Sequence, residues 1–206
     1  MDKKNKLLEK YQGKRDFRKT SEPFGDELSE DNNKPLFVIQ KHDAQNLHYD
    51  FRLEVEGALK SWAIPKGPST GPGDKRLAIP TEDHPLDYAD FEGVIPEDNY
   101  GAGTVIVWDT GPYENITEKN GKKIPMKEAI DTGKVSVNLD GKKLKGGYAL
   151  IRTGAGNRSR WLLVKIDDEE ADARRNPVST EPESVLTGRT IEETASEAAD
   201  KLNDGG

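Results

Sequence analysis

The sequence predicts an all-β protein, a compact single domain that forms a barrel or a sandwich, with an N-terminal arm and an acidic C-terminal tail. Its 206 residues suffice for one domain with a proper core. From Pro35 to Ile166, short apolar or alternating runs are separated by Gly, Pro, Asn and Asp, a pattern typical of all-β domains. Only Met126–Asp131 suggests a helical turn in this region, which argues against alternating strand and helix units.

The predicted elements fall into three parts. Residues 1–33 are dense in charge and are expected to form an arm with a short helix at Lys3–Tyr11. Residues 34–166 are expected to form the barrel or sandwich, with a tight hairpin turn at Glu56-Gly57 and a looser turn at Gly154–Asn157. Residues 167–206 form an acidic, largely flexible tail with a marginal helix at Thr190–Leu202. The expected strands are Leu36–Gln40, Leu47–Val55, Ala58–Ile64, Leu77–Thr81, Thr104–Trp108, Val135–Leu139, Tyr148–Arg152 and Trp161–Ile166.

Composition excludes several classes of site. The chain has no cysteine, so disulfides, thiolate nucleophiles and cysteine-bound metals are excluded, and any metal must be held by His, Asp and Glu. No stretch approaches the roughly 20 apolar residues of a membrane span, and we expect a soluble, cytoplasmic protein without a membrane partner.

The net charge of −7 argues at first against a nucleic-acid partner. Residues 167–206 alone carry −8, however, and residues 131–166 carry +6. That basic stretch is either the solvated face of a sheet or a surface that contacts phosphate.

The segment Leu47–Val55 is the most informative in the sequence. Alternate side chains of a strand point to opposite faces, so His48, Asp50 and Arg52 share one face. The opposite face is a complete apolar stripe that can pack into a core. The polar face is either an ordinary solvated surface or a functional site.

Two details favour a functional site. His42 arrives from the end of the preceding strand and adds a third nitrogen or oxygen ligand to those of His48 and Asp50, with positions left open for water and substrate. Arg52 follows on the same face, and its planar guanidinium suits phosphate. The guanidinium and a metal cation would repel each other, so their proximity makes sense if an anion lies between them.

The third histidine of the chain, His84, lies after a predicted strand and before a loop limited by Pro85. Functional side chains are often placed on such loops. Its pKa, expected near the working range, would let it hold phosphate or protonate a leaving oxygen. Tyr88 either binds the same phosphate or has a structural role.

Missing motifs narrow the chemistry further. The sequence has no Gly-rich loop followed by Lys and Ser/Thr, no G-x-S-x-G and no H-E-x-x-H. Asn138 stands where a nucleotidyl-transfer motif around Asp140-Gly141 would need its lysine, which excludes covalent nucleotidyl transfer.

Several long runs of the sequence closely resemble the 3′-phosphoesterase module of bacterial DNA ligase D and its free-standing relatives. The resemblance covers roughly residues 10–166, and residues 184–190 are similar to a segment beyond the core of relatives. Runs of this length are more specific than any short motif. They are Phe37-Val38-Ile39-Gln40-Lys41-His42-Asp43-Ala44, Leu47-His48-Tyr49-Asp50-Phe51-Arg52-Leu53-Glu54, Ser61-Trp62-Ala63-Ile64-Pro65-Lys66-Gly67-Pro68, Glu82-Asp83-His84-Pro85-Leu86-Asp87-Tyr88, Phe91-Glu92-Gly93-Val94-Ile95-Pro96 and Tyr100-Gly101-Ala102-Gly103.

The resemblance implies a β-barrel enzyme of non-homologous end joining that heals DNA 3′ ends with manganese. Such an enzyme removes a 3′-terminal ribonucleoside to leave a 3′-phosphate, then hydrolyses that phosphate to a 3′-hydroxyl. The family pattern assigns His42, His48 and Asp50 to the metal and Arg52, His84 and Tyr88 to the scissile phosphate. It also implies that the arm contributes to the site, with secondary candidates Arg15, Asp16, Glu22, Gln40 and Glu82.

The expected partners are DNA primer-template 3′ ends that carry a terminal ribonucleotide or a 3′-phosphate. The 206 residues contain no polymerase or ligase region, so a ligase, polymerase or end-binding protein would act in trans. Two other functions remain open. His48-x-Asp50 with a distal His84 imitates the ligand triad of a non-haem iron oxygenase, and a non-catalytic module that binds 3′ ends would need the same fold.

Overall fold

The structure is a computed structural model that describes residues 3–25, 34–154 and 159–204. Within these ranges the strands are β1 (Leu36–Asp43), β2 (Leu47–Val55), β3 (Ala58–Ile64), β4 (Lys75–Pro80), β5 (Gly93–Ile95), β6 (Gly103–Asn115), β7 (Glu118–Lys119), β8 (Lys122–Lys123), β9 (Lys134–Asp140), β10 (Lys145–Thr153) and β11 (Arg160–Lys165). The helices are α1 (Lys3–Gln12), the 3₁₀ helix η1 (Leu86–Asp90), α2 (Met126–Thr132), α3 (Pro177–Thr180) and α4 (Ile191–Asp204).

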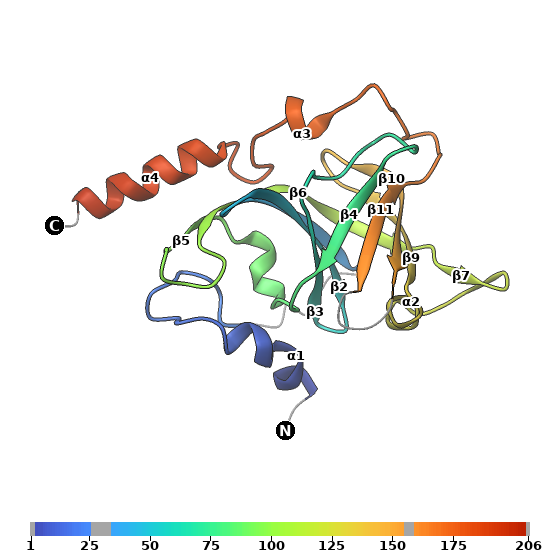
Figure 1. The fold of residues 1–206 in the computed structure, drawn as a ribbon, viewed down its shortest axis with the longest axis horizontal. Helices are drawn as coiled ribbons and strands as arrows, with labels where there is room; N and C mark the ends of the chain where they lie inside the picture. The colour runs from blue at the N-terminus through green and yellow to red at the C-terminus, as the bar shows by residue number, and fades with distance from the viewer. Residues whose placement is uncertain (1–2, 26–33, 155–158, 205–206) are drawn as a thin grey trace.

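Eight antiparallel strands close into a barrel in the order β1-β2-β3-β4-β11-β10-β9-β6 (Figure 1). The ring closes because β6 pairs with β1 along residues 104–112 and then with β9 along residues 113–115. Strand β5 adds to β6 outside the ring, and β7 and β8 form a separate hairpin that projects from the barrel. The predicted all-β barrel is confirmed.

Strand β1 is buried on both faces, because two separate cores lie on either side of it. Phe37 and Ile39 of β1, with Phe51 of β2, belong to the core inside the barrel. Val38, between them, belongs to a second core on the outer face, which the N-terminal arm and η1 help to build. Period-two alternation therefore separates two buried faces here, whereas one buried and one solvated face would be usual for an antiparallel sheet.

The hairpin between β2 and β3 follows the prediction. Glu56 and Gly57 both have positive φ, at 51° and 81°, as the two central residues of a type I′ turn require. The two-residue turn fixes the register, so that Arg52 lies opposite Ser61. Of the predicted looser turn at Gly154–Asn157, residues 155–157 lie outside the described residues.

Strand β6 is much longer than predicted, and the buried carboxylate of Asp109 explains the difference. The prediction ended the strand at Trp108, because Asp, Thr, Gly and Pro follow it and these residues are common in turns. Instead, Asp109 accepts hydrogen bonds from the backbone N–H groups of Thr110, Lys142, Lys143 and Leu144. Its side chain thus organises the loop before β10 while its backbone continues the strand.

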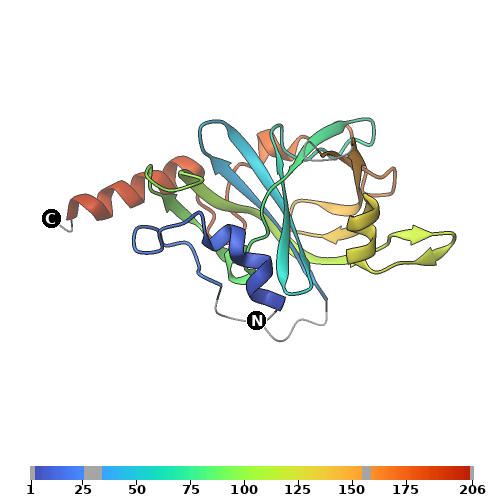
Figure 2. The ribbon, with the colours of Figure 1, turned by 60° about the horizontal axis from the view of Figure 1, so that its bottom comes forward.

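The arm lies against the outer core, and its helix α1 agrees with the short helix expected at Lys3–Tyr11. Helix α1 and the following loop cross the same side of the barrel as η1 (Figure 2). Tyr11 is fully buried, and its ring centroid lies 5.1 Å from that of His84. Its hydroxyl donates to the carbonyl of Pro23 at 2.6 Å.

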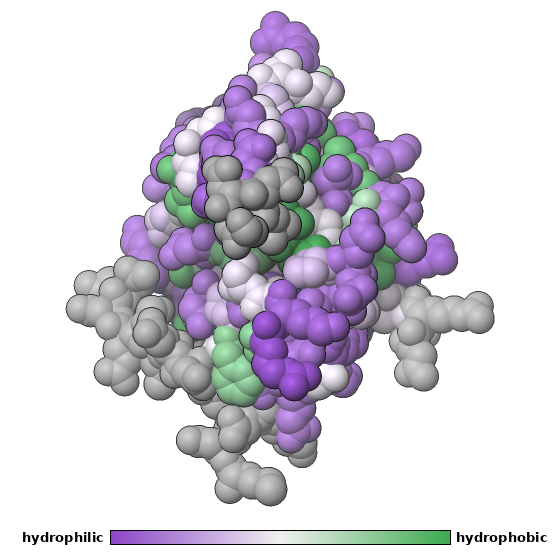
Figure 3. All heavy atoms as spheres, turned by 90° about the vertical axis from the view of Figure 1, so that its left-hand side faces the viewer, coloured by the Kyte–Doolittle hydropathy of each residue, from purple (hydrophilic) through white to green (hydrophobic). Residues whose placement is uncertain are grey.

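Residues beyond the barrel also make specific contacts with it. Trp108 Nε1 donates to the carbonyl of Glu181 at 2.7 Å, and the backbone N–H of Val185 donates to Val107 at 2.9 Å. Helix α4 then extends away from the barrel (Figure 1), although Ile191 at its start is buried. The face that carries α4 is largely hydrophilic, with small hydrophobic patches between polar residues (Figure 3). The boundaries predicted for arm, barrel and tail remain predictions.

The basic stretch has intramolecular partners. Lys143 and Lys165 are buried and donate to backbone carbonyls of Glu181 and Gly147. Lys145 pairs with Asp140 at 2.8 Å. Arg158 lies outside the described residues. Among the helices of the described ranges, none is long and apolar enough to cross a membrane.

Candidate functional site

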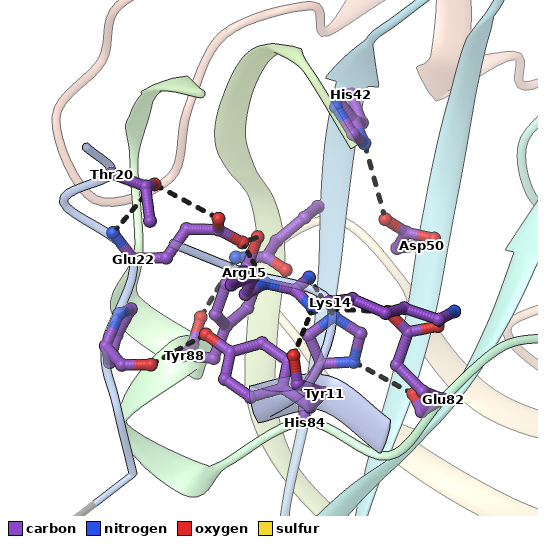
Figure 4. A network of polar contacts seen from close by, with 12 residues as sticks. Tyr11, Lys14, Arg15, Thr20, Glu22, His42, Asp50, Glu82, His84 and Tyr88 are labelled. Atoms are coloured by element: carbon purple, nitrogen blue, oxygen red, sulfur yellow. Dashed lines mark hydrogen bonds and ion pairs between the residues drawn. The ribbon is translucent and has the colours of Figure 1, made fainter. Parts of the chain in front are cut away.

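The pairing of β1 with β2 brings the three candidate metal ligands together on the outer face of the barrel. His42 lies opposite His48, and Gln40 lies opposite Asp50. Asp50 Oδ2 is 3.8 Å from His42 Nδ1 and 3.8 Å from His48 Nε2, and Figure 4 shows His42 directed toward Asp50. One potential ligand atom from each residue lies within 4.8 Å of the others.

The hydrogen bonding of these side chains leaves nitrogen atoms available to a divalent cation. His48 Nδ1 lies 2.9 Å from the carbonyl of Asn46; donation there leaves the lone pair of Nε2 available to a metal, as is usual for histidine ligands. His42 Nε2 is buried without a hydrogen-bond partner. Ligand atoms about 2.0–2.2 Å from an ion are at most about 4.4 Å apart, so the cluster need tighten by only a few tenths of an ångström.

Arg52 joins this cluster to the other half of the site. Its Nη2 donates to Asp50 Oδ2 at 3.0 Å, and its Nε donates to Gln40 Oε1 at 2.8 Å. Its Nη1 contacts both Ser61 Oγ and His84 Nδ1 at 2.8 Å. The Arg52 side chain is almost fully buried, so the guanidinium is held in one orientation. At least one of its five N–H groups has no acceptor among the described residues.

Electrostatics keep Asp50 ionised. Burial opposes the charged form, but the Arg52 guanidinium and the contacts with His42 and His48 hold the pKa of Asp50 well below its ordinary value. A carboxylate that is ionised and has two imidazole neighbours suits a metal ligand.

His84 reaches the cluster from the loop before η1. Its backbone pairs with Leu59 of β3, and its Nδ1 is also 2.9 Å from the carbonyl of Glu82. Burial and the nearby charges of Arg52 and Arg15 hold the pKa of His84 well below 6.5. The expectation of a pKa near the working range is therefore wrong for the substrate-free site, where His84 is neutral.

The arm supplies a second buried guanidinium. Arg15 Nε pairs with Glu22 Oε1 at 2.8 Å, and both side chains are almost completely buried. Arg15 Nη2 lies 3.5 Å from His84 Nε2. Tyr88 donates its hydroxyl to Glu22 Oε1 at 3.1 Å, so the structure connects Tyr88 to the arm. Figure 4 shows these residues gathered around His84.

The other secondary candidates divide into two groups. Gln40 donates from Nε2 to the carbonyls of Tyr88 and Phe91, both at 3.0 Å, so it orients Arg52 and anchors η1. Glu82 pairs with Lys14 at 3.0 Å and with Arg15 at 3.3 Å. Asp16, in contrast, pairs with the exposed Arg18, and the structure does not bring it to the site.

A cavity of about 180 Å³ joins the two halves of the site. Its lining includes His42, His48 and Asp50 on one side and Arg52, His84, Tyr88 and Arg15 on the other. An anion in this cavity can contact a cation held by the first group and the guanidinium groups of the second.

Two residues that contribute to the site, Ser61 and Lys14, were absent from the sequence prediction. Ser61 accepts a hydrogen bond from Arg52. The Glu56-Gly57 turn could have predicted this contact, because a two-residue hairpin places residue 61 opposite residue 52. No local pattern predicts the contact of Lys14, since its partner Glu82 is distant in sequence.

Comparison with known proteins agrees with this geometry. The model of the DNA ligase D 3′-phosphoesterase domain matches residues 40–152. A multifunctional non-homologous end joining protein LigD from Pseudomonas aeruginosa is 49% identical over 199 residues, which cover 95% of this chain and 23% of that protein. A multifunctional non-homologous end joining DNA repair protein LigD from Mycobacterium tuberculosis is 46% identical over 163 residues, 79% of this chain and 20% of that protein. The chain thus spans about a fifth to a quarter of the length of these relatives.

Proposed function

Because the chain belongs to the family of DNA ligase D 3′-phosphoesterase domains, we propose that it is a manganese-dependent phosphoesterase that heals DNA 3′ ends. It removes a 3′-terminal ribonucleoside to leave a 3′-phosphate, and then hydrolyses this phosphate to a 3′-hydroxyl. The observation that supports this most strongly is the two-sided cavity, with a ligand set for a cation on one side and two buried arginines on the other.

His42, His48 and Asp50 are the residues that would hold the ion. When bound, a divalent cation supplies a Lewis acid that offsets charge on phosphate oxygens. Three nitrogen and oxygen donors leave coordination positions open for substrate, and two imidazoles with one carboxylate can hold divalent first-row metals, Mn²⁺ among them.

Arg52 and His84 hold the phosphate on the other side of the cavity. Arg52 is fixed by Gln40, Ser61 and Asp50, so it offers a donor to developing negative charge without reorganisation. Neutral His84 approaches Arg15 through Nε2, and a bound phosphate anion would raise its pKa and allow it to pass a proton to the leaving oxygen. Tyr88 contacts phosphate only if its hydroxyl leaves Glu22, and this role stays a prediction.

The buried Arg52 between Asp50 and His84 favours phosphate chemistry over a non-haem iron oxygenase, since oxygen activation has no need of a guanidinium there. Within the cell we propose DNA primer-template 3′ ends as substrates, with a ligase, a polymerase or an end-binding protein as partners in end joining.

A labelled primer-template with one 3′-terminal ribonucleotide tests the proposal. Incubation with manganese should produce 3′-phosphate ends first and 3′-hydroxyl ends later, and Asp50→Ala or His48→Ala should lose both products. Arg18→Ala, at an exposed position, is the control. Full phosphatase activity in the Asp50→Ala variant would refute the assignment. Tight end binding without turnover across several divalent metals would instead support a non-catalytic module.

A further inference from the structure

A second groove, of about 570 Å³, opens beside the candidate site. It is continuous with the site cavity, because Ala44, His48, Tyr100 and Gly101 line both. This size falls in the range of small-molecule pockets, roughly 300–1,000 Å³. A molecule bound in the groove would therefore touch the histidine that we assign to the metal.

The lining of this groove combines apolar surface with several polar side chains, and it includes no lysine or arginine among its described residues. Gln45, Asn46, Glu97 and Asn99 contribute amide or carboxylate groups. The exposed carboxylate of Glu97 forms no ion pair with any described residue, and Asn99 Nδ2 is buried without a hydrogen-bond partner. The exposed Glu97 carboxylate thus offers the groove an acceptor for a neutral ligand with hydroxyl groups.

Tyr100 adds an aromatic surface where the groove meets the site. Its side chain is 51% exposed, although Lys14 Nζ lies 4.0 Å from the ring centroid. The next residue, Gly101, has φ of +79°, and a Cβ there would lie 3.9 Å from His42 Cε1. The backbone beside Tyr100 therefore lies against a candidate metal ligand, and Tyr100 itself lines the cavity of the candidate site.

The groove on the other side of His48 has a similar balance of polar and apolar lining, but no carboxylate among its described lining residues. It is lined by Leu47, Ala63, Pro65 and Ile79, together with Asn46. Leu47 and Ile79 are 46% and 42% exposed, so this side offers apolar contact but no carboxylate acceptor.

We propose that the groove lined by Glu97, Asn99 and Tyr100 holds the nucleoside that leaves in the diesterase step. Tyr100 stacks on the base, while the Glu97 carboxylate accepts hydrogen bonds from the sugar hydroxyls. A carboxylate performs this task on ribose in dinucleotide-binding proteins. A free nucleoside carries no phosphate, so it needs no lysine or arginine, whereas Glu97 would repel the phosphates of the retained strand.

This inference rests on the proposed function. In the diesterase step water adds its hydroxyl to phosphorus, the bond between phosphorus and O5′ of the terminal nucleoside breaks, and O5′ takes a proton. The monoesterase step has no leaving nucleoside. Side chains that bind only this nucleoside should therefore affect the first step and not the second.

The test compares kcat/KM on two duplexes of the same sequence, one with a 3′-terminal ribonucleotide and one with a 3′-phosphate. Glu97→Ala and Tyr100→Ala should each lower the ratio of diesterase to monoesterase activity at least tenfold. Tyr100→Phe keeps the ring and should keep the ratio. Glu118→Ala removes an exposed carboxylate from the β7–β8 hairpin and should also leave the ratio unchanged.

A ratio that stays within twofold of wild type in Glu97→Ala and Tyr100→Ala would overturn the assignment of the groove, and so would an equal fall of both activities. In either case the wild-type protein still hydrolyses both ends, so the proposed function stands. A wild-type protein with neither activity would overturn the proposed function and the groove together.

Discussion

Replacing Arg52 with methionine should destabilise the protein strongly even when no metal or substrate is present. The methionine side chain has similar length but no donors. Arg52 is 2% exposed and contacts Gln40, Asp50, Ser61 and His84. Arg52→Met would leave the Asp50 carboxylate buried without its guanidinium, and Gln40 Oε1 without its donor.

Breaking a buried ion pair from one side costs about 3–5 kcal/mol, because the remaining charge keeps its desolvation cost. A protein of this size loses roughly 2–4 °C in Tm per kcal/mol. We therefore expect Arg52→Met to lower Tm by roughly 6–20 °C. Thermal and urea unfolding, followed by circular dichroism with a chelator present, measure this change.

Two further variants show whether the loss of stability comes from breaking the buried ion pair. Arg18→Met removes a guanidinium whose side chain is 89% exposed, and it should leave the Tm and the urea midpoint unchanged. The double variant Asp50→Asn with Arg52→Met removes both charges, and it should recover about 1 kcal/mol or more relative to the sum of the single changes. An Arg52→Met protein within about 1 kcal/mol of wild type would refute the reasoning.

Three other changes test the arm, the tail contacts and the start of β6. Burial opposes the charge of Glu82, but Lys14 and Arg15 hold its pKa below 4.5. The carboxylate therefore stabilises the fold above pH 4.5. This stabilisation is lost as the pH falls through the pKa of the folded state. Glu82→Gln should be less stable than wild type at pH 7, with a smaller difference at pH 3, by urea unfolding. Burial lowers the pKa of Lys143 from 10.5 to about 8. The unfolded chain then binds more protons between these values, so wild-type stability should rise with pH across this window more than that of Lys143→Met. A Cβ on Gly103 would lie 2.1 Å from Asp43 O, so Gly103→Ala should cost about 1–3 kcal/mol, whereas Gly73→Ala, with open space around it, should cost far less.

Each of these predictions has a contrary outcome. A stability difference for Glu82→Gln that is the same at pH 3 and pH 7 would show that the carboxylate charge does not hold the arm. Parallel stability curves for wild type and Lys143→Met above pH 8 would show that this lysine is not perturbed by burial. Equal stability of Gly103→Ala and Gly73→Ala would contradict the close approach at Asp43.

The central strand of the site could be predicted because alternation is a local property. In β2, the apolar residues Tyr49 and Phe51 enter the barrel core, and Asp50 and Arg52 lie on the other face, as their spacing indicates. The burial of that second face could not be predicted in the same way. It depends on Tyr11 and Arg15, which come from a charged segment with little apolar character of its own and pack against distant residues.

Short and irregular elements were missed for physical reasons. Strand β5 has only three residues and η1 has five, too few to show a period. The strand β6 continues through Gly111 and Pro112 because pairing partners and the Asp109 carboxylate override their turn preference. The pKa of His84 depends on two arginines that the fold brings beside it, and no local pattern carries that information.

Manganese binding measured by electron paramagnetic resonance tests the central claim most directly, because the signal of free Mn²⁺ falls as the ion binds. The division of the site into a metal side and a phosphate side predicts one Mn²⁺ per wild-type chain, loss of this binding in His48→Ala, and retention in His84→Ala. Equal manganese affinity in His48→Ala and wild type would contradict the assignment of the metal to His42, His48 and Asp50.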